Sequence, residues 1–310
     1  MTQNEQGTAT PAVSIGMPVY NGEKYIREAL DSVLAQTYQA FELIISDNAS
    51  NDRTQEICME YAKRDARIRY VRQSSNLGGH WNFNFVAREA KGSLFTWLAH
   101  DDILMPHFLE EAVQFMSRRP KAVLVAGDFK VIDEDGAELG TEKLERIRDH
   151  IQWNKRCVEF FKYPISNVFF CIYGVMKSEI CRSVFLAIKE PKIAAGSELP
   201  ILARFAAAGE IASIPVILRK YRRHAASMYV RELAEISKRS IFHRFRIRIG
   251  KSYRLRFDQW AVLLSSALSP SLKCAIAFKV LFYYMRRLLR RILRISLIKK
   301  GIRRLINSVG

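Results

Sequence analysis

Short apolar runs alternate with segments of helical periodicity over the first hundred residues of this 310-residue chain. The runs lie at residues 13–18, 41–46, 68–71 and 93–99. Their length and composition are typical of buried strands, and the segments between them carry apolar residues at helical spacing. Strands that alternate with helices in this way predict an α/β fold, with a mostly parallel central sheet flanked by helices on both faces.

The fourth run ends in two adjacent carboxylates, Asp101 and Asp102, and Pro106 stands where the first turn of a helix is expected. Open α/β sheets bind ligands at the carboxyl ends of their strands, and Tyr20 and Asp47 follow earlier runs on the same expected rim. Adjacent carboxylates repel each other unless a cation lies beside them. A divalent ion that also holds substrate phosphates would suit them. The alternative is that Asp101 caps a helix while Asp102 is solvated.

Two common phosphate-binding motifs are absent from the sequence. No G-x-G-x-x-G follows the first run, and no G-x-x-x-x-G-K-[ST] occurs, so dinucleotide and P-loop sites lose their main support. A nucleotide site without a glycine cradle needs another way to neutralise a diphosphate. A metal ion at Asp101 and Asp102 would supply one.

Charge divides the chain into two parts. Residues 229–310 carry 20 Lys or Arg and 3 Asp or Glu, whereas residues 1–228 carry 29 and 28. We therefore expect a flexible arm over residues 1–12, a globular domain over 13–228 and a basic helical extension over 229–310. The five cysteines form no C-x-x-C pair, which suits a reducing cytosol, and the first twelve residues lack the apolar segment of a signal peptide.

Four motifs in this order resemble family 2 glycosyltransferases, which have the GT-A fold: Pro18-Val19-Tyr20-Asn21, Ser46-Asp47-Asn48-Ala49-Ser50-Asn51-Asp52, Asn76-Leu77-Gly78 and Ala99-His100-Asp101-Asp102. The resemblance covers residues 13–227. It implies that Pro18, Tyr20 and Asp47 bind the nucleotide, with Asp47 on the base. It also implies that Asp101 and Asp102 meet the donor and a Mg²⁺ or Mn²⁺ ion.

The same resemblance adds further residues to the expected donor site, namely Asn21, Asn76, Asn84 and Arg222. Arg222 belongs to a segment, residues 219–227, that is similar to the family's closing Y-R-x-H motif; a basic loop is the alternative. The chain departs from the family at Ala99, where D-x-D has its first aspartate, and at Phe83, where many relatives have arginine. The first departure allows weak or dispensable metal binding.

Glu198 stands six positions before Arg204, and relatives place an acidic catalytic base about six positions before an arginine of the following helix. The resemblance therefore implies that Glu198 is the base. The alternative is a charge at the amino end of the helix expected over residues 201–208, where the helix dipole favours it. The apolar run at 168–174 is predicted as a strand, either near the acceptor or in the core, and the charged residues 136–150 as a surface excursion.

The basic extension contains a predicted amphipathic helix. Over residues 279–294 apolar side chains fill one arc of a helix and basic side chains fill another. Such a helix is of the type that lies in an anionic membrane interface, although its apolar stripe could also pack on the globular domain. No charge-free run reaches the ~18 residues of a spanning helix, and no RNA-binding motif surrounds the arginines.

These patterns and the resemblance together predict a peripheral enzyme on the cytoplasmic face of the cell membrane. It would transfer a sugar, with inversion, from a nucleotide-sugar donor to a saccharide or lipid-linked acceptor, in cell-surface polysaccharide or glycolipid synthesis, without a nucleic-acid partner. A nucleotidyltransferase is the alternative enzyme, but the glycine- and basic-rich first loop expected of it is missing. A non-catalytic membrane scaffold with a degenerate transferase body is the alternative from another class.

Overall fold

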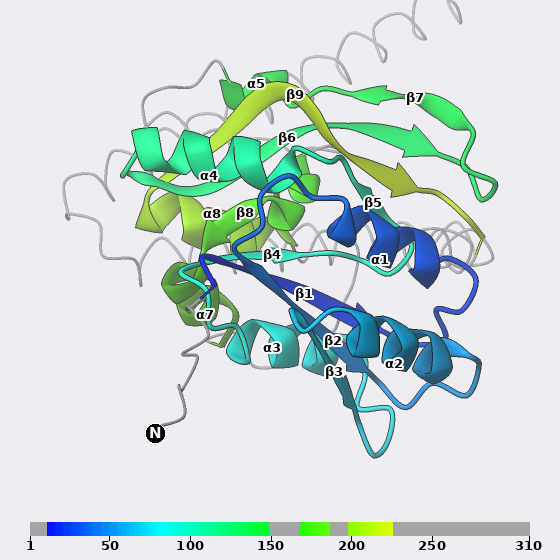
Figure 1. Ribbon diagram of the computed structural model, residues 1–310. Helices are drawn as coiled ribbons and strands as arrows, with labels where there is room; N and C mark the ends of the chain where they lie inside the picture. The colour runs from blue at the N-terminus through cyan, green and yellow to red at the C-terminus, as the bar shows by residue number, and fades with distance from the viewer. Residues whose placement is uncertain (1–10, 149–167, 187–197, 226–310) are drawn as a thin grey trace, which may run out of the picture.

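The computed structural model describes residues 11–148, 168–186 and 198–225. The expected extension over 229–310 lies outside them, as do residues 1–10 of the expected arm. Over the described ranges, nine strands form one sheet in the order β3-β2-β1-β4-β8-β6-β9-β5, with β7 paired to β6 (Figure 1). No helix in these ranges is long and apolar enough to cross a membrane.

The first half of the sheet is parallel, as predicted. It consists of β1 (Val13–Val19), β2 (Phe41–Asp47), β3 (Ile68–Arg72) and β4 (Leu94–Trp97), joined by α1 (Ile26–Leu34), α2 (Thr54–Arg64) and α3 (Gly79–Arg88). The chain runs outward from β1 through β2 to β3, then returns to the other side of β1 to form β4. The carboxyl ends of β1 and β4 therefore flank the switch point, where open α/β sheets bind their ligands.

The second half of the sheet is mixed. It contains β5 (Ile103–Leu104), β6 (Ala122–Ile132), β7 (Glu138–Glu142), β8 (Val175–Lys177) and β9 (Glu210–Arg222). The long strands β6 and β9 are parallel, whereas β8 is antiparallel to both β4 and β6 and so joins the two halves. The helices here are α4 (Phe108–Arg118), α5 (Glu145–Arg148), α7 (Ser178–Leu186) and α8 (Glu198–Ala208).

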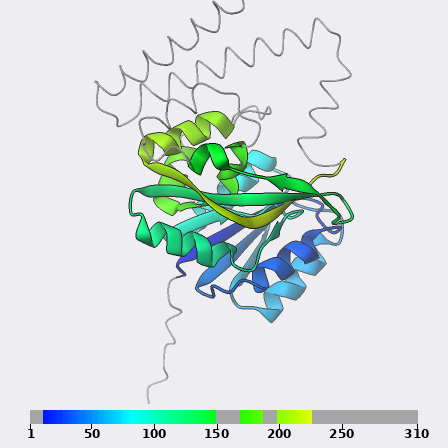
Figure 2. The ribbon, with the colours of Figure 1, turned by 90° about the horizontal axis from the view of Figure 1, so that it is seen from above.

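Two hydrophobic clusters cover the two faces of the sheet. Side chains of α1, α2 and α4 bury the odd-numbered residues of β1 on one face, and side chains of α3, α7 and α8 bury Phe95 and Trp97 of β4 on the other. Figure 2 shows this separation, with blue α1 and α2 and teal α4 on one side of the sheet and yellow-green α8 on the other. The core thus supports the strands from both sides.

Pro18 is tolerated inside β1 because of where β4 ends. The Leu98 N–H donates to the Gly16 carbonyl at 3.0 Å, so the backbone groups of Gly16, and of Pro18 two residues later, point toward β4. The β1–β4 pairing stops at Gly16 and Trp97. The missing N–H of Pro18 therefore removes no bond of the ladder.

The prediction of a strand over 168–174 is wrong. Residues Val168–Tyr173 form a 3₁₀ helix, η1, and the strand β8 starts only after Gly174. A short apolar run cannot by periodicity alone distinguish a buried strand from a buried helical turn. Gly174 lies against the Val125 carbonyl of β6, where a Cβ atom would clash.

Two segments for which no strand was predicted contain one. The charged excursion at 136–150 includes the edge strand β7, four of whose five residues are exposed, and this exposure explains its polar sequence. The segment beginning at Arg219, for which a loop was the alternative, continues β9 as far as Arg222 and pairs with β6.

Candidate active site

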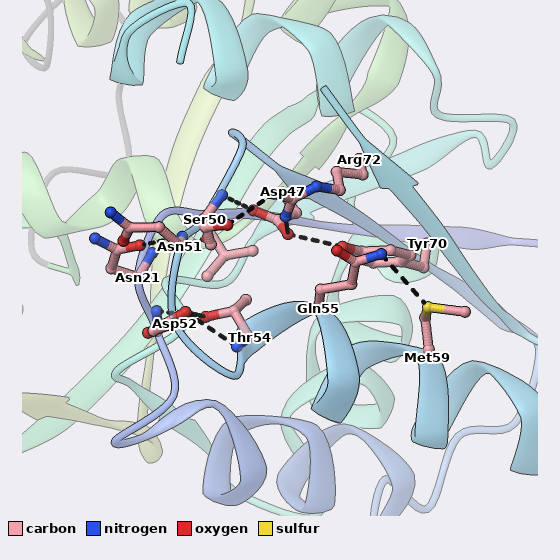
Figure 3. Close-up of polar contacts among 12 residues, drawn as sticks. Asn21, Asp47, Ser50, Asn51, Asp52, Thr54, Gln55, Met59, Tyr70 and Arg72 are labelled. Carbon is pink, nitrogen blue, oxygen red and sulfur yellow. Dashed lines mark hydrogen bonds and ion pairs between the residues drawn. The ribbon is translucent and has the colours of Figure 1, made fainter. Parts of the chain in front are cut away.

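The loops that follow β1 and β2 hold each other through their backbones. Three backbone N–H groups of the first loop and two of the second donate to side chains of the other loop or of the first residue of α2, at 2.8–3.0 Å: Asn21 to Ser50 Oγ, Gly22 to Thr54 Oγ1, Glu23 to Asp52 Oδ2, Asn51 to Asn21 Oδ1, and Arg53 to Glu23 Oε2. Figure 3 shows part of this clasp. It makes a fixed rim, from which the 44% exposed side chain of Tyr20 projects.

Asp47 ends β2 and is fully buried. Its Oδ1 accepts a hydrogen bond from the Ser50 N–H at 2.8 Å, and its Oδ2 accepts from Tyr70 Oη at 2.7 Å and from Arg72 Nη1 at 2.8 Å (Figure 3). Burial and the bond to Asp47 raise the pKa of Tyr70. The carboxylate is thus engaged from inside the protein by three donors.

Arg72 is the charged group of this cluster that reaches solvent, because its side chain is 34% exposed. Asp47 and the Ser50 carbonyl hold the guanidinium by Nη1 and Nη2. Sequence reasoning did not single out Arg72. The signal that could have found it is the pairing of β2 with β3, which places Arg72 directly beside Asp47.

The loop after β3 joins the same rim through two asparagines. Asn48 Nδ2 donates to Asn76 Oδ1 at 2.8 Å, and the Leu77 N–H donates to Asn48 Oδ1 at 2.9 Å. Asn84 lies instead on α3, where its Nδ2 is 2.9 Å from Nε2 of His80 on the same helix. The structure therefore brings Tyr20, Asn21, Asp47 and Asn76 onto linked loops, with Pro18 beside them on β1 and Asn84 on a separate element.

Asp101 lies beyond the end of β4 and meets a residue from beyond the end of β9. His224 Nε2 is 2.9 Å from Asp101 Oδ2, and the two side chains are 9% and 16% exposed. Burial by itself would raise the pKa of Asp101, but the hydrogen bond with His224 and the nearby His100 outweigh it and lower that pKa. Asp101 therefore keeps its charge. His224 was not named from the sequence, although it ends the Y-R-x-H motif.

Asp102 points the other way, into the protein, and is 2% exposed. Its Oδ2 accepts from the Arg219 guanidinium and its Oδ1 accepts from the Arg222 N–H at 2.9 Å. Burial acts to raise the pKa of Asp102, and the adjacent positive charge of Arg219 opposes that rise and favours the charged carboxylate. The carboxylate is thus paired within the protein.

Arg222, which the resemblance placed at the donor, is 1% exposed. Its guanidinium donates to the carbonyls of Asp101 at 3.0 Å, Asp133 at 3.3 Å and Glu134 at 3.2 Å, and to Glu28 Oε2 at 2.7 Å. The side chain therefore joins α1, the β6–β7 turn and the turn after β4, and all three of its guanidinium nitrogens have partners in the protein.

The two candidate metal ligands, Asp101 and Asp102, differ in the partners that their carboxylate oxygens already have. Among the described residues, no three His, Cys, Asp or Glu side chains cluster as a metal site. Mg²⁺ is nevertheless often held by one or two protein groups together with substrate phosphates and water. Asp101, with His224 beside it, fits a site of this sparse kind. Asp102 does not fit it, because Arg219 and Arg222 already hold both of its oxygens.

Glu198 is the first residue of α8, which begins three residues earlier than predicted. The helix dipole stabilises a carboxylate at this position whether or not the residue is catalytic. Its side chain lies outside the described part of the structure, so its role as a base stays a prediction.

Comparisons with known proteins concern the family and the fold of the chain. A model of the family described as "Glycosyl transferase family 2" matches residues 14–178. An uncharacterized glycosyltransferase of Rickettsia typhi is 35% identical over 136 residues, which cover 44% of this chain and 42% of the relative. The glycosyltransferase GlyG of Streptococcus pneumoniae is 31% identical over 124 residues, which cover 40% and 41%. The chain thus spans about two fifths of the length of these relatives.

Solved structures show the same fold. Residues 1–349 of S. aureus TarS, in complex with UDP-GlcNAc, match with a TM-score of 0.63 and 16% identity, over 88% of this chain and 72% of that one. The mannosyltransferase PcManGT of Pyrobaculum calidifontis, in complex with GDP-Man and Mn²⁺, matches with a TM-score of 0.52 and 17% identity, over 94% and 87%. These likenesses confirm the predicted GT-A fold. Because the family model covers more than half of its residues, the chain belongs to glycosyl transferase family 2.

Proposed function

We propose that this protein transfers a sugar from a nucleotide-sugar donor to a hydroxyl group of an acceptor. The observation that carries the proposal is that the Asp47–Arg72 cluster and the Asp101–His224 pair lie at the carboxyl ends of β2 and β4, the two parallel strands on either side of β1. Family membership supports it, as do the UDP-GlcNAc and GDP-Man complexes of the structural neighbours.

Arg72 and Tyr20 form the base end of the proposed donor site. Asp47 holds Arg72 from behind, which leaves the exposed side of the guanidinium to donate to a carbonyl oxygen of the base. The exposed ring of Tyr20 offers a surface on which a base can stack. In this arrangement Asp47 acts on the base through Arg72, and Asn21 and Asn76 hold the loops that surround it.

Asp101 and His224 form the diphosphate end of the same site and are the residues that would hold Mg²⁺ or Mn²⁺. A divalent cation bound there would supply positive charge to stabilise the leaving diphosphate. Asp101 is suited to this position because its lowered pKa keeps it charged. PcManGT, which was solved with Mn²⁺, supports the choice of cation.

The proposed reaction is a single displacement with inversion at the anomeric carbon. Glu198 accepts the proton of the acceptor hydroxyl while the hydroxyl oxygen bonds to the anomeric carbon, and the bond from that carbon to the diphosphate oxygen breaks. The position of Glu198 at the start of α8 supports this role only in part, because the same position suits a helix-terminal charge.

We place the enzyme on the cytoplasmic face of the cell membrane, where it would act on a saccharide or lipid-linked acceptor in polysaccharide or glycolipid synthesis. The sequence of the basic region over residues 229–310 supports this proposal, because it contains 20 Lys or Arg and only 3 Asp or Glu. Basic amphipathic helices bind anionic lipid through both their charges and their apolar face.

The experiment that tests the proposed function is a donor screen on the full chain. UDP-, GDP-, dTDP- and CMP-sugars are incubated with the protein in the presence of Mn²⁺, Mg²⁺ or EDTA, and released nucleotide is measured. We expect hydrolysis of one donor class and its loss in EDTA. Release of pyrophosphate from a nucleoside triphosphate would point instead to a nucleotidyltransferase, and no turnover with any donor would favour the non-catalytic scaffold.

A further inference from the structure

We infer that Asp102 is a positioning residue, which anchors the end of β9 to the turn after β4 and thereby places His224 against Asp101. It is not a ligand of the metal or the donor. This inference rests on the proposed function, which assigns the Asp101–His224 pair to the metal. The contacts of Asp102 that carry it are made within the protein and need no ligand.

The first step is the weakness of the backbone pairing at this point. The residue after Asp102 begins β5, which has two residues and pairs with β9 only at Ile103–Lys220 and Leu104–Arg219. On its other side β9 pairs with β6 as far as Arg222, but so short a β5 ladder joins β9 to the turn after β4 with few hydrogen bonds. The Asp102 carboxylate extends this attachment beyond Lys220, because it accepts from the Arg222 N–H, and strengthens it within the ladder, because it also accepts from the Arg219 guanidinium.

The second step is the network that Arg222 builds from this anchor. Its guanidinium lies 4.5 Å from the centroid of the Tyr25 ring and donates to the Asp101 carbonyl and to Glu28 of α1. The Asp101 carbonyl is therefore held by a side chain whose own backbone is held by Asp102. The two neighbouring aspartates are fixed to the same residue of β9.

The third step places the histidine. His224 follows Arg222 by two residues, and its ring lies 5.0 Å from the ring of Tyr25, centroid to centroid. The ring of Tyr25 thus contacts both Arg222 and His224. The Arg223 N–H donates to the Ile132 carbonyl of β6 at 2.8 Å, and the bonds of Asp102 and of the Asp101 carbonyl to Arg222 fix this strand end against the turn that carries Asp101. His224 thereby comes within 2.9 Å of Asp101.

Charge explains why an aspartate is needed for the anchor. Arg219 and Asp102 are 5% and 2% exposed, so each is the counter-ion of the other in a medium of low dielectric constant. Removing one partner leaves a buried charge without compensation, whereas removing both leaves none. If Asp102 were a metal ligand, the second change would not rescue the first, because no substitution at Arg219 can restore a lost coordinating oxygen.

The test compares Asp102→Asn, Arg219→Gln and the double variant with the parent in the full chain. Hydrogen–deuterium exchange of the peptide that contains residues 219–224 reports on the end of β9, and electron paramagnetic resonance measures Mn²⁺ affinity in the presence of UDP. We expect Asp102→Asn to speed exchange and to weaken Mn²⁺ binding at least tenfold. The double variant should return the Mn²⁺ affinity to within about threefold of the parent.

A matched control is Asp65→Asn, which changes another carboxylate paired with an arginine, Arg67 at 2.7 Å, beside β3 at the opposite edge of the sheet. It should lower Tm without changing exchange at residues 219–224 or Mn²⁺ affinity. The inference is overturned if Asp102→Asn leaves exchange unchanged, or if the double variant binds Mn²⁺ as weakly as Asp102→Asn. If the parent itself binds no Mn²⁺, the proposed metal dependence fails, and the exchange data alone decide the role of Asp102.

Discussion

His224 Nε2 lies 2.9 Å from Asp101 Oδ2, although the two residues are 123 positions apart in the chain. Asp101 follows β4, in the parallel half of the sheet, and His224 follows β9, in the mixed half. The pair therefore exists only when both halves of the sheet have folded and packed side by side. Formation of the pair therefore indicates that the two halves of the sheet are correctly packed together.

Asp101→Asn should abolish sugar transfer while leaving the fold intact. The change removes a negative charge from the diphosphate end and alters little volume, so Tm should stay near that of the parent. Turnover with the preferred donor and thermal unfolding are measured on the same preparations, with Asp135→Asn in the exposed β6–β7 turn as the control. Parental turnover of Asp101→Asn with metal present would show that the assignment of Asp101 is wrong.

Arg72→Gln should raise the KM for the donor with a smaller effect on kcat. Hydrogen bonds to a charged group contribute about 1.5–3 kcal/mol, so a rise of about tenfold to 100-fold is expected. Arg64→Gln, on the exposed surface of α2, is the matched control, since surface ion pairs contribute little. An unchanged KM for Arg72→Gln would mean that the base binds elsewhere.

Glu198→Gln should lower kcat by about 10²–10⁴-fold, because general-base catalysis contributes that much, and should leave donor affinity nearly unchanged. Steady-state kinetics with a defined acceptor separates the two quantities. If turnover stays normal while Tm falls, Glu198 serves the end of α8 and another group is the base.

Gly92→Ala should destabilise the domain by about 1–3 kcal/mol, the usual cost of overpacking. A Cβ atom at Gly92 would lie 2.8 Å from the Ser14 nitrogen, in backbone that cannot move aside without disturbing β1. Gly79→Ala is the control, because open space surrounds Gly79 at the start of α3. Urea unfolding of both variants checks the difference, and equal stabilities would contradict this packing argument.

Replacement of five arginines in the basic region by glutamine should release the protein from anionic vesicles. The residues are Arg286, Arg287, Arg290, Arg291 and Arg294, which lie outside the described structure. Each basic residue near such a surface contributes about 1 kcal/mol, and salt screens it. Vesicle co-sedimentation measures binding, with truncation before residue 281 beside it. Donor hydrolysis should be unchanged in the five-fold variant. If that variant still binds anionic vesicles, the membrane proposal is wrong.

The alternation of apolar runs with helical periodicity determined the parallel half of the fold. Hydrophobic spacing is a local property, and the parallel direction follows from the helical crossovers, so the positions of β1 to β4 could be read from the chain. The same logic placed Tyr20, Asp47 and Asp101 on one rim. It failed at Val168–Tyr173, where six apolar residues suit a strand and a 3₁₀ helix equally well.

Tertiary structure alone decided which way each charged group faces. Asp101 and Asp102 are neighbours in sequence, yet one reaches the rim and the other enters the protein, because Asp102 has its partners 117 and 120 positions away on β9. The same packing gives Arg222 internal partners and makes Arg72, not Asp47, the charged side chain of its cluster that faces solvent. Burial and counter-ions are supplied by residues distant in the chain, and no local pattern records them.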